Sequence, residues 1–513
     1  MNNMFCFQCQ ETCGNVGCTQ TGACGKTSAN ANAMDKLIRQ LKLIALNKKP
    51  SHATAIFIAR SLFMTVTNTV FSEKTIIYQL RRAEKITGIS PYDAPLGVHS
   101  DADEDICSLH EFILYALKGI SAYMIHADNL GKSDESLDDF LFRALRICAE
   151  NRNFHELNSF LSECGSAAIK AMMLLDEANT ENFGSPEKTV VRTSPGLRGG
   201  ILVSGHDLKD LYELLLLSAD KNVDIYTHGE MLPAHAYPVF KQFPHLYGHY
   251  GSAWHHQNVE FESFNGPILL TSNCITPIQE KYSRRIFTTG CCHYPGVTYI
   301  ESPGPGLLKD FTPLIETAQN SPPPRMLKNN ELVIGFAHAQ LSEYLDSIID
   351  NIHNHSIRRI IFLAGCDGRQ KKREYYTDVA ANLPPDTIIM TAGCAKFRYN
   401  DFALGEINGI PRLLDAGQCN DSYSLAVFIL KLKEKLGCED INQLPISFDI
   451  AWYEQKAVAI LLALLSLGFK NIRLGPTLPA FISPRLLRHL EKEFKLKSIT
   501  TSHDDINSML HGK

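Results

Sequence analysis

Apolar residues in the first 180 positions recur at intervals of three or four, which is the spacing of one face of an α-helix. Two such stripes consist of Met34, Leu37, Ile38, Leu41 and Ala45, and of Leu137, Leu141, Leu145 and Cys148. Ser108 and Glu111 have the spacing of a capping box ahead of the apolar run 112–120. No alternating strand pattern occurs in this region, so it is predicted to be helical.

From about residue 200 the pattern changes to short apolar runs, each followed by small or polar residues and then by a helical stretch. The runs begin at Ile201, Val223, Pro267, Leu332, Arg359, Thr387, Ile446 and Asn471. Strands that alternate with helices predict parallel sheets. The longest apolar stretch, 457–469, is too short to span a bilayer and predicts a buried helix.

These patterns predict an α/β multidomain protein. A helical domain with an amino-terminal cysteine cluster is expected over residues 1–195, followed by two α/β domains with parallel sheets over 196–325 and 326–513. The polar stretch 179–200, with its Gly and Pro residues, is predicted to be a linker, and the Pro-rich stretch 321–324 marks the boundary between the two α/β domains.

Composition narrows the possible functions. The chain has 513 residues, and its 50 Lys+Arg against 55 Asp+Glu give a net charge of -5, which argues against broad electrostatic binding to nucleic acid or to an anionic membrane. The first ten residues contain no apolar run preceded by basic residues, so no secretory signal is predicted and a cytoplasmic location is expected. Thiols stay reduced there, so the 15 cysteines are expected to be core residues, metal ligands or catalytic groups.

Four cysteines near the amino terminus have the spacing of metal ligands. Cys6, Cys9, Cys18 and Cys24 follow the pattern C-x2-C-x8-C-x5-C, among glycines that permit the tight turns needed around one centre. Four thiolates suit a structural zinc or an iron–sulfur cluster, and the spacing leans mildly to iron–sulfur. A cysteine-rich flexible end is the alternative. Cys13 lies inside the pattern and is interpreted as a non-ligand, with substitution for Cys18 as the other possibility.

A second set of metal-ligating residue types follows the predicted strands. In open parallel sheets, active sites form beyond the carboxyl ends of the strands. That position is occupied here by His206, Glu230, Cys274, Cys366, Cys394, Cys419 and Glu454. A single cysteine there is usually a small core residue, but seven such residues favour a metal centre. Mixed sulfur, nitrogen and oxygen donors suit a cluster with chemically different irons, at least one able to bind substrate.

The segments around these residues resemble the hybrid-cluster proteins, also called prismane proteins or hydroxylamine reductases. The resemblance covers essentially the whole chain. It rests on segments that begin at Phe5 (FCFQCQET), Gly205 (GHDLKDL), Thr227 (THGEMLPAH), Thr271 (TSNC), Ala364 (AGCDGR), Thr391 (TAGCAK), Asp415 (DAGQCNDSY) and Ala451 (AWYEQKA). The stretch 289–295 departs from the family pattern and looks shorter, which leaves the roles of Cys291, Cys292 and His293 open.

The resemblance implies a helical domain and two Rossmann-like domains that carry two clusters. It implies a [4Fe-4S] cluster on Cys6, Cys9, Cys18 and Cys24. It also implies a hybrid iron–sulfur–oxygen cluster of the [4Fe-2O-2S] type whose ligands carry over as His206, Glu230, Cys274, Cys366, Cys394, Cys419 and Glu454. In the family, the cysteine that matches Cys366 can carry an extra sulfur as a persulfide.

The activity implied by the resemblance is the reduction of hydroxylamine to ammonia and water, with electrons from an external donor protein. Glu230 or Glu454 would shift to open a coordination site, and Lys456 is the candidate proton donor, on the expectation that it follows Glu454 on a strand or an extended turn. His228 and His235 are weaker proton-donor candidates. Alternatives are nitric oxide reduction in nitrosative stress defence, S-nitrosylation of proteins, nickel-dependent carbon monoxide dehydrogenation, and electron carriage without catalysis.

Overall fold

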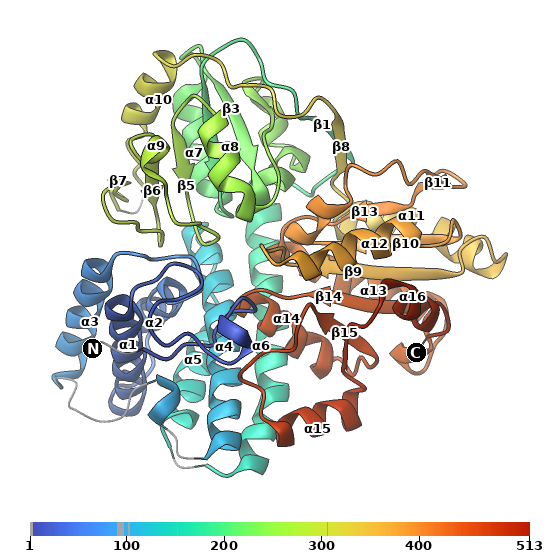
Figure 1. Cartoon of the computed structure of the whole chain (residues 1–513), viewed down its shortest axis with the longest axis horizontal. Helices are drawn as coiled ribbons and strands as arrows, with labels where there is room; N and C mark the ends of the chain where they lie inside the picture. Colours follow the sequence, from blue (N-terminus) through green and yellow to red (C-terminus); the bar gives the residue numbers. More distant parts are fainter. Residues whose placement is uncertain (1–3, 90–96, 101–102, 151, 305, 513) are drawn as a thin grey trace.

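The computed structural model describes residues 4–89, 97–100, 103–150, 152–304 and 306–512, so the first three of the ten residues used for the signal prediction lie outside it. Six α-helices of the described residues form the amino-terminal region, coloured blue to teal in Figure 1. They are α1 (Ser28–Asn47), α2 (His52–Met64), α3 (Glu73–Thr87), α4 (Glu104–Asn129), α5 (Glu135–Ile147) and α6 (Phe154–Phe183). The two predicted apolar stripes lie on α1 and α5 and face the core, which confirms a helical first region.

The capping box predicted at Ser108 and Glu111 is wrong. Helix α4 begins five residues earlier than this capping box predicts, at Glu104, because the carboxylate of Asp103 caps it by accepting hydrogen bonds from the backbone N–H groups of Asp105 (2.8 Å) and Ile106 (3.2 Å). Ser108 and Glu111 therefore lie inside the helix, on buried positions.

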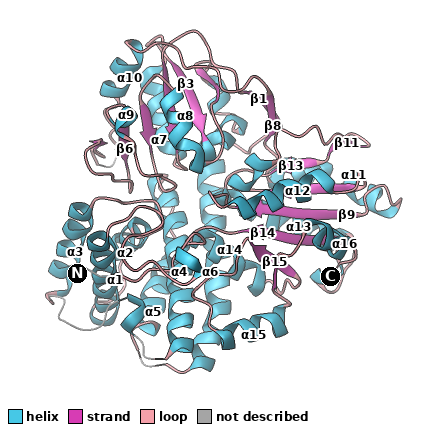
Figure 2. Ribbon diagram, in the orientation of Figure 1, coloured by secondary structure: helices cyan, strands magenta, loops and turns pink. Residues whose placement is uncertain are grey.

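The first parallel sheet has the strand order β4-β3-β2-β5-β6-β7. In the described residues its strands are β2 (Gly200–Ser204), β3 (Asp224–His228), β4 (Leu246–His249), β5 (Ile268–Leu270), β6 (Ile286–Thr289) and β7 (Thr298–Ile300). Helices α7 (Leu208–Ser218), α8 (Gln257–Ser263), α9 (Glu280–Ser283) and α10 (Thr312–Gln319) accompany it (Figure 2). Two separate apolar clusters pack against it.

The second parallel sheet has the order β13-β10-β9-β14-β15-β16. Its strands are β9 (Arg359–Gly365), β10 (Thr387–Thr391), β13 (Leu413–Asp415), β14 (Ile446–Ala451), β15 (Ile472–Gly475) and β16 (Lys497–Ser498). The helices around it are α11 (His338–His353), α12 (Glu374–Asn382), α13 (Ser422–Lys435), α14 (Gln455–Ser466), α15 (Pro484–Phe494) and α16 (Ser502–Leu510), and the short strands β11 (Glu406–Ile407) and β12 (Ile410–Pro411) form a hairpin. The α/β class with parallel sheets is thus confirmed.

The strand predicted at Leu332 and the linker predicted at 179–200 both differ from the sequence prediction. The run that begins at Leu332 forms β8 (Glu331–Ile334), which pairs antiparallel with β1 (Thr189–Arg192) outside both six-stranded sheets. Strand β1 lies within the stretch 179–200, and α6 extends into that stretch as far as Phe183, so this stretch is not a simple linker. Because alternate residues of β8 are exposed, it is a half-covered ribbon strand and not an inner strand of a sheet.

Helix α14 connects the second sheet to the helical region. The predicted buried helix at 457–469 is present, although α14 ends at Ser466, and it packs against both α4 and α6 (Figure 1). The contact with α6 is close: a Cβ atom added at Gly165 would lie 2.2 Å from the carbonyl oxygen of Leu462. One apolar cluster therefore runs from the helical region into the second sheet, and the predicted domain limits at 195 and 325 stay predictions.

We expect Gly165→Ala to destabilise the protein by about 1–3 kcal/mol, because the added methyl group forces α6 away from α14. Ser166→Ala is the matched control, since Ser166 is exposed on the same helix. The measurement is the urea midpoint of unfolding, followed by circular dichroism under anaerobic conditions. Equal urea midpoints for the two variants would contradict this prediction, because they would show that moving α6 away from α14 costs no free energy of unfolding.

Candidate metal centres

Seven side chains from the two sheets meet at one cavity. Three follow β2, β3 and β5, which are neighbours in the first sheet: His206, Glu230 and Cys274. Four follow β9, β10, β13 and β14, which are neighbours in the second: Cys366, Cys394, Cys419 and Glu454. All seven line the same cavity, together with Trp254, Gly365 and Tyr453. Every residue that the strand-end pattern singled out is brought to this one place, where the carboxyl edges of the sheets converge.

Glycines shape the strand ends from which the cysteines project. Gly365 and Gly393 precede Cys366 and Cys394 and have φ of +112° and +90°. A Cβ atom at Gly393 would lie 2.4 Å from the carbonyl oxygen of Gly365, and one at Gly365 would lie 2.1 Å from that of Ala451. The ends of β10, β9 and β14 therefore approach one another more closely than any side chain allows.

Cys274 adopts a backbone conformation that is rare outside glycine. Its φ is +78°, in the left-handed region, and its side chain lines the cavity. Such a conformation costs about 1–3 kcal/mol and is retained where the surrounding structure demands it. The strain directs the thiol to the other donors.

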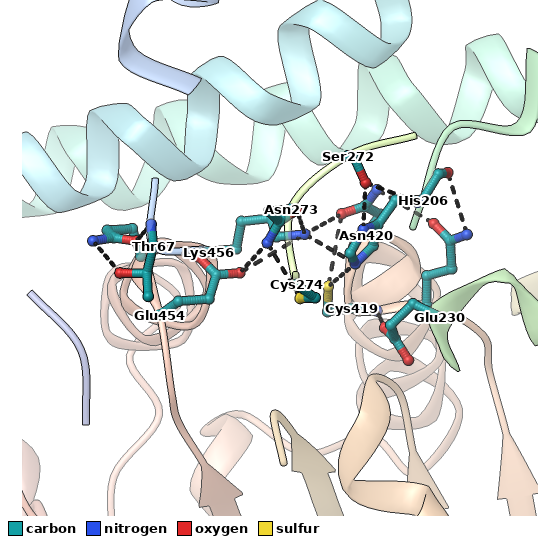
Figure 3. A network of polar contacts seen from close by, with 12 residues as sticks. Thr67, His206, Glu230, Ser272, Asn273, Cys274, Cys419, Asn420, Glu454 and Lys456 are labelled. Atoms are coloured by element: carbon teal, nitrogen blue, oxygen red, sulfur yellow. Dashed lines mark hydrogen bonds and ion pairs between the residues drawn. The ribbon is translucent and has the colours of Figure 1, made fainter. Parts of the chain in front are cut away.

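His206 is fixed in a definite orientation. Its backbone N–H donates to the Oγ of Ser272 (2.9 Å), and its Nδ1 lies 2.8 Å from the same Oγ, so Nε2 is the nitrogen that faces the cavity (Figure 3). Nε2 lies 3.6 Å from the Sγ of Cys419. Burial, and next the ammonium of Lys456, hold the pKa of His206 well below its usual value, so the ring is neutral, as a metal ligand requires.

Glu230 carries an oxygen without a protein partner. Its Oε2 accepts a hydrogen bond from the backbone N–H of Cys419 (2.7 Å), whereas Oε1 is buried and has no hydrogen-bond partner among the described residues. One donor atom each from His206, Glu230 and Cys419 lie within 4.8 Å of one another. A buried carboxylate oxygen left unpaired beside an imidazole nitrogen and a sulfur fits coordination to a metal.

Glu454 caps helix α14 and lies beside Lys456. Its Oε2 accepts from the backbone N–H of Lys456 (2.8 Å), and its Oε1 lies 3.7 Å from the Lys456 ammonium. Lys456 is in the first turn of α14 and not on a strand or extended turn, as expected from sequence. The bend at the helix start nevertheless brings its Nζ to 3.1 Å from Nε2 of His206 and 3.2 Å from Oδ1 of Asn273 (Figure 3).

Two asparagines complete the surroundings and were missed in the sequence. Asn273 donates to Oε1 of Glu454 (3.4 Å), and Oδ1 of Asn420 lies 3.5 Å from Nζ of Lys456. Each is adjacent in sequence to a cysteine of the cavity, and that adjacency was the available signal.

The electrostatics of the cavity call for a positively charged occupant. Burial raises the pKa of the Cys366 thiol to about 12 and those of Cys274, Cys394 and Cys419 well above the usual value. Without a compensating cation these sulfurs stay protonated, because desolvation penalises the thiolates. Soft thiolate ligands select metals such as zinc and iron, and bound iron supplies the charge that lowers these pKa values. The donor set therefore fits an iron-containing group.

The four amino-terminal cysteines line a second cavity. Cys6 and Cys18 pair through their backbones, with N–H to carbonyl distances of 3.0 and 2.8 Å, and this pairing closes the loop around the sulfurs. Cys13 is exposed and is not among the residues that line the cavity, which agrees with its interpretation as a non-ligand. Burial raises the pKa of Cys6 to about 12 and that of Cys9 well above its usual value, so these two thiols stay protonated without a compensating cation.

The two cavities are joined by direct contacts between their loops. The backbone N–H of Gln10 donates to the carbonyl of Tyr453 (2.9 Å), and Nε2 of Gln455 donates to Oε1 of Gln8 (2.9 Å). Gln8 and Gln10 flank Cys9, whereas Tyr453 and Gln455 flank Glu454. The chain thus holds its two candidate centres next to each other.

Other sequence candidates have local partners. His228 lies 3.0 Å from the Oγ of Ser204 and 2.8 Å from a carboxylate oxygen of Glu260, and His235 contacts the hydroxyl of Thr227 at 3.0 Å. Cys291 is buried, with its Sγ 3.8 Å from Nη1 of Arg60. None of these residues is among those that line the two cavities.

The helical region, the two parallel sheets and the two cysteine-rich cavities define a protein built around buried metal clusters. A sequence profile of the Prismane/CO dehydrogenase family matches residues 4–507. The chain therefore belongs to this family, which confirms the resemblance to hybrid-cluster proteins and implies iron–sulfur clusters.

Curated relatives align over their whole length. The hydroxylamine reductase of Chlorobaculum tepidum is 48% identical, with 99% of this chain and 100% of the relative covered. That of Nitratidesulfovibrio vulgaris is 46% identical, with the same coverage. Among solved structures, carbon monoxide dehydrogenase IV from Carboxydothermus hydrogenoformans shares the fold, with a TM-score of 0.60, 14% identity, and 99% of this chain and 92% of that chain covered. In the described residues we find no helix with the length and apolar character to cross a membrane.

We expect Gly393→Ala to lower the iron content of the protein, because the new methyl group would collide with the carbonyl of Gly365 and displace Cys394. Gly409→Ala is the matched control: its φ is also positive (+84°), but a Cβ atom there meets nothing within 4 Å. Iron and acid-labile sulfide are measured on anaerobically purified protein. Full iron content in Gly393→Ala would contradict the geometric role of this glycine.

Proposed function

We propose that this protein is an iron–sulfur oxidoreductase that reduces hydroxylamine to ammonia and water, with two electrons and two protons consumed for each N–O bond broken. The main support is the convergence of four cysteines, two glutamates and a histidine on one largely buried cavity. The full-length relatives named hydroxylamine reductase point to the same reaction. A simple electron carrier has no need of such mixed donors.

Two clusters are part of the proposal. Cys6, Cys9, Cys18 and Cys24 would hold a [4Fe-4S] cluster. The seven donors of the sheet-edge cavity would hold a hybrid cluster of the [4Fe-2O-2S] type, with Cys366 able to carry a persulfide sulfur. When bound, the hybrid cluster supplies electrons and a Lewis-acidic iron to the nitrogen substrate.

The residues of the chain have separable tasks. Glu230 is held by one oxygen through the Cys419 N–H and keeps the other free, so its carboxylate can shift without losing its anchor. Glu454 is held similarly at the start of α14. Trp254 and Tyr453, with rings 4.6 Å apart at the cavity wall, exclude bulk water.

Lys456 would donate a proton to the leaving oxygen. Burial alone would lower the pKa of Lys456, but Cys419 and Glu454, when ionised as ligands, raise it by their negative charge and keep the ammonium protonated. Its Nζ lies at hydrogen-bond distance from His206, which is itself a cavity donor. A proton is therefore available beside the position that substrate would occupy.

Electrons would come from an external donor protein to the amino-terminal centre, whose cysteine loop is partly exposed. The contacts from Gln8 and Gln10 to the segment around Glu454 support this route, because they join the loops of the two cavities. No disulfide joins the cysteines of the described residues, which supports a reducing compartment such as the cytoplasm.

Nitric oxide reduction is the second candidate. An apolar cavity lined by Phe362, Ala364, Leu425 and Phe448, among others, shares Gly365 with the cluster cavity. Such a space admits a small apolar molecule more readily than a strongly hydrated one. It therefore favours nitric oxide as an additional substrate.

We expect anaerobically purified protein to contain iron and sulfide without nickel and to reduce hydroxylamine with a reduced viologen dye as electron donor. The kcat/KM for hydroxylamine and for nitric oxide, measured on the same sample, ranks the two substrates. Zinc in place of iron, or no turnover of either substrate at full iron loading, would refute the proposed function.

We expect Lys456→Ala to lower kcat for hydroxylamine by about 100-fold, because general acid catalysis by a positioned side chain contributes at least that much. Lys431→Ala is the control, since Lys431 makes only a surface contact with Ser342. The pH profile of kcat is recorded for both variants at matched iron content. An unchanged profile and rate in Lys456→Ala would remove Lys456 from the mechanism.

A further inference from the structure

Cys13 lies beside a cysteine of the amino-terminal cavity without facing the cavity itself. Its Sγ is 3.5 Å from the Sγ of Cys18. Cys18 lines the cavity and is only 3% exposed, whereas Cys13 is exposed on the outer side of the loop. The two sulfurs thus form a pair in which one member faces solvent and the other faces the candidate cluster.

The local backbone brings the two cysteines together. Cys13 begins a short 3-10 turn, and its carbonyl oxygen accepts hydrogen bonds from the N–H groups of Val16 (3.0 Å) and Gly17 (3.1 Å), so the chain reverses before it reaches Cys18. Cys18 is held by its backbone pairing with Cys6, and its Sγ accepts a hydrogen bond from the N–H of Ala23 (3.3 Å). Cys18 is therefore held by its backbone and by its sulfur, whereas Cys13 lies on an exposed turn.

The geometry allows a covalent bond between these sulfurs after a small movement. A disulfide requires a sulfur–sulfur distance of about 2.05 Å. The turn between the cysteines contains Gly14, whose φ is +60° and whose added Cβ would meet nothing within 4 Å, so the exposed turn has space to adjust.

We propose that Cys13 and Cys18 are a redox-active pair that closes to a disulfide when the amino-terminal cluster is absent. The oxidant is a low-molecular-weight disulfide such as oxidised glutathione. The exposed Cys13 attacks it, which forms a mixed disulfide and releases one thiol. Cys18 then attacks the Cys13 sulfur and releases the second thiol, so that two protein thiols are oxidised and one small disulfide is reduced. This proposal rests on the cluster of the proposed function.

The pair would protect the empty site. A cysteine that has lost its metal can be oxidised beyond the sulfenic acid wherever oxidants reach it, and that oxidation is largely irreversible. A disulfide with Cys13 holds Cys18 in a form that a reducing dithiol restores. When the cluster is bound, the Cys18 sulfur is occupied, and Cys13 remains a single accessible thiol.

The test compares cluster-loaded protein with the same full-length protein after anaerobic iron removal. Both are treated with oxidised glutathione, free thiols are blocked with N-ethylmaleimide, and peptides are analysed by mass spectrometry. We expect a Cys13–Cys18 disulfide in the iron-depleted protein only. Cys18→Ser should instead retain glutathione on Cys13, and Cys438→Ser, at a half-buried cysteine outside both cavities, should form the disulfide as the unmodified protein does.

Cluster reinsertion gives a second measurement. After glutathione treatment, refilling of the unmodified protein with iron and sulfide should be lost and then restored by dithiothreitol, whereas Cys13→Ser should refill without reductant. Cys18 linked to Cys6, Cys9 or Cys24 in place of Cys13, or equal loss of refilling in Cys13→Ser, would overturn the proposal. Lower iron content in untreated Cys13→Ser would also overturn it, since Cys13 would then be a ligand. Hydroxylamine turnover of the untreated, loaded protein is measured separately, so failure of the proposed function is told apart from failure of the pair.

Discussion

The structure depends on the cost of burying acidic groups together. Four thiols and two carboxylates share one cavity, and desolvation raises the pKa of each of them. The nearby ammonium of Lys456 is a single charge and cannot balance six anionic donors. A cationic metal centre offsets this cost, because it both neutralises the negative charge of the donors and forms coordination bonds to them. Cluster binding and the final arrangement of the sheet edges are therefore expected to depend on each other.

The fold meets this requirement by placing two sheet edges against one helix start. Neighbouring strands in each parallel sheet end at the same edge. The residues that follow these strands therefore lie close together. Positive-φ glycines such as Gly365 and Gly393 then let the backbones approach within contact of one another. Glu454 at the N-cap of helix α14 and Lys456 in its first turn complete the cavity, and the packing of α14 against α4 and α6 ties the cavity to the region that carries the cysteine loop.

Much of this arrangement was predictable from sequence, because it follows from periodicity and position. The strand-end residues from His206 to Glu454 were identifiable since parallel strands deliver their carboxyl ends to one edge. Other features depend on tertiary contacts. The run at Leu332 has the composition of an inner strand, yet it pairs with β1, and composition does not specify a partner. The start of α4 was misplaced because Asp103 and Ser108 are both acceptable caps, and only packing selects between them. The approach of Lys456 to His206 spans 250 positions and has no local signature.

The amino-terminal cysteines also need a cation to balance buried sulfurs, but they are less enclosed than the donors of the sheet-edge cavity. Its cysteines are carried by one short segment whose turns are exposed, whereas the donors of the sheet-edge cavity are carried by seven strand ends embedded in the core. Loss of metal leaves the inner thiols enclosed by the two sheets, where oxidants have little access. The amino-terminal cavity instead lies under a loop whose turns reach the surface, with Cys13 exposed on it. A spare cysteine is useful only in the second situation, and Cys13 occurs there, in contact with the one cavity cysteine that the turn brings within its reach.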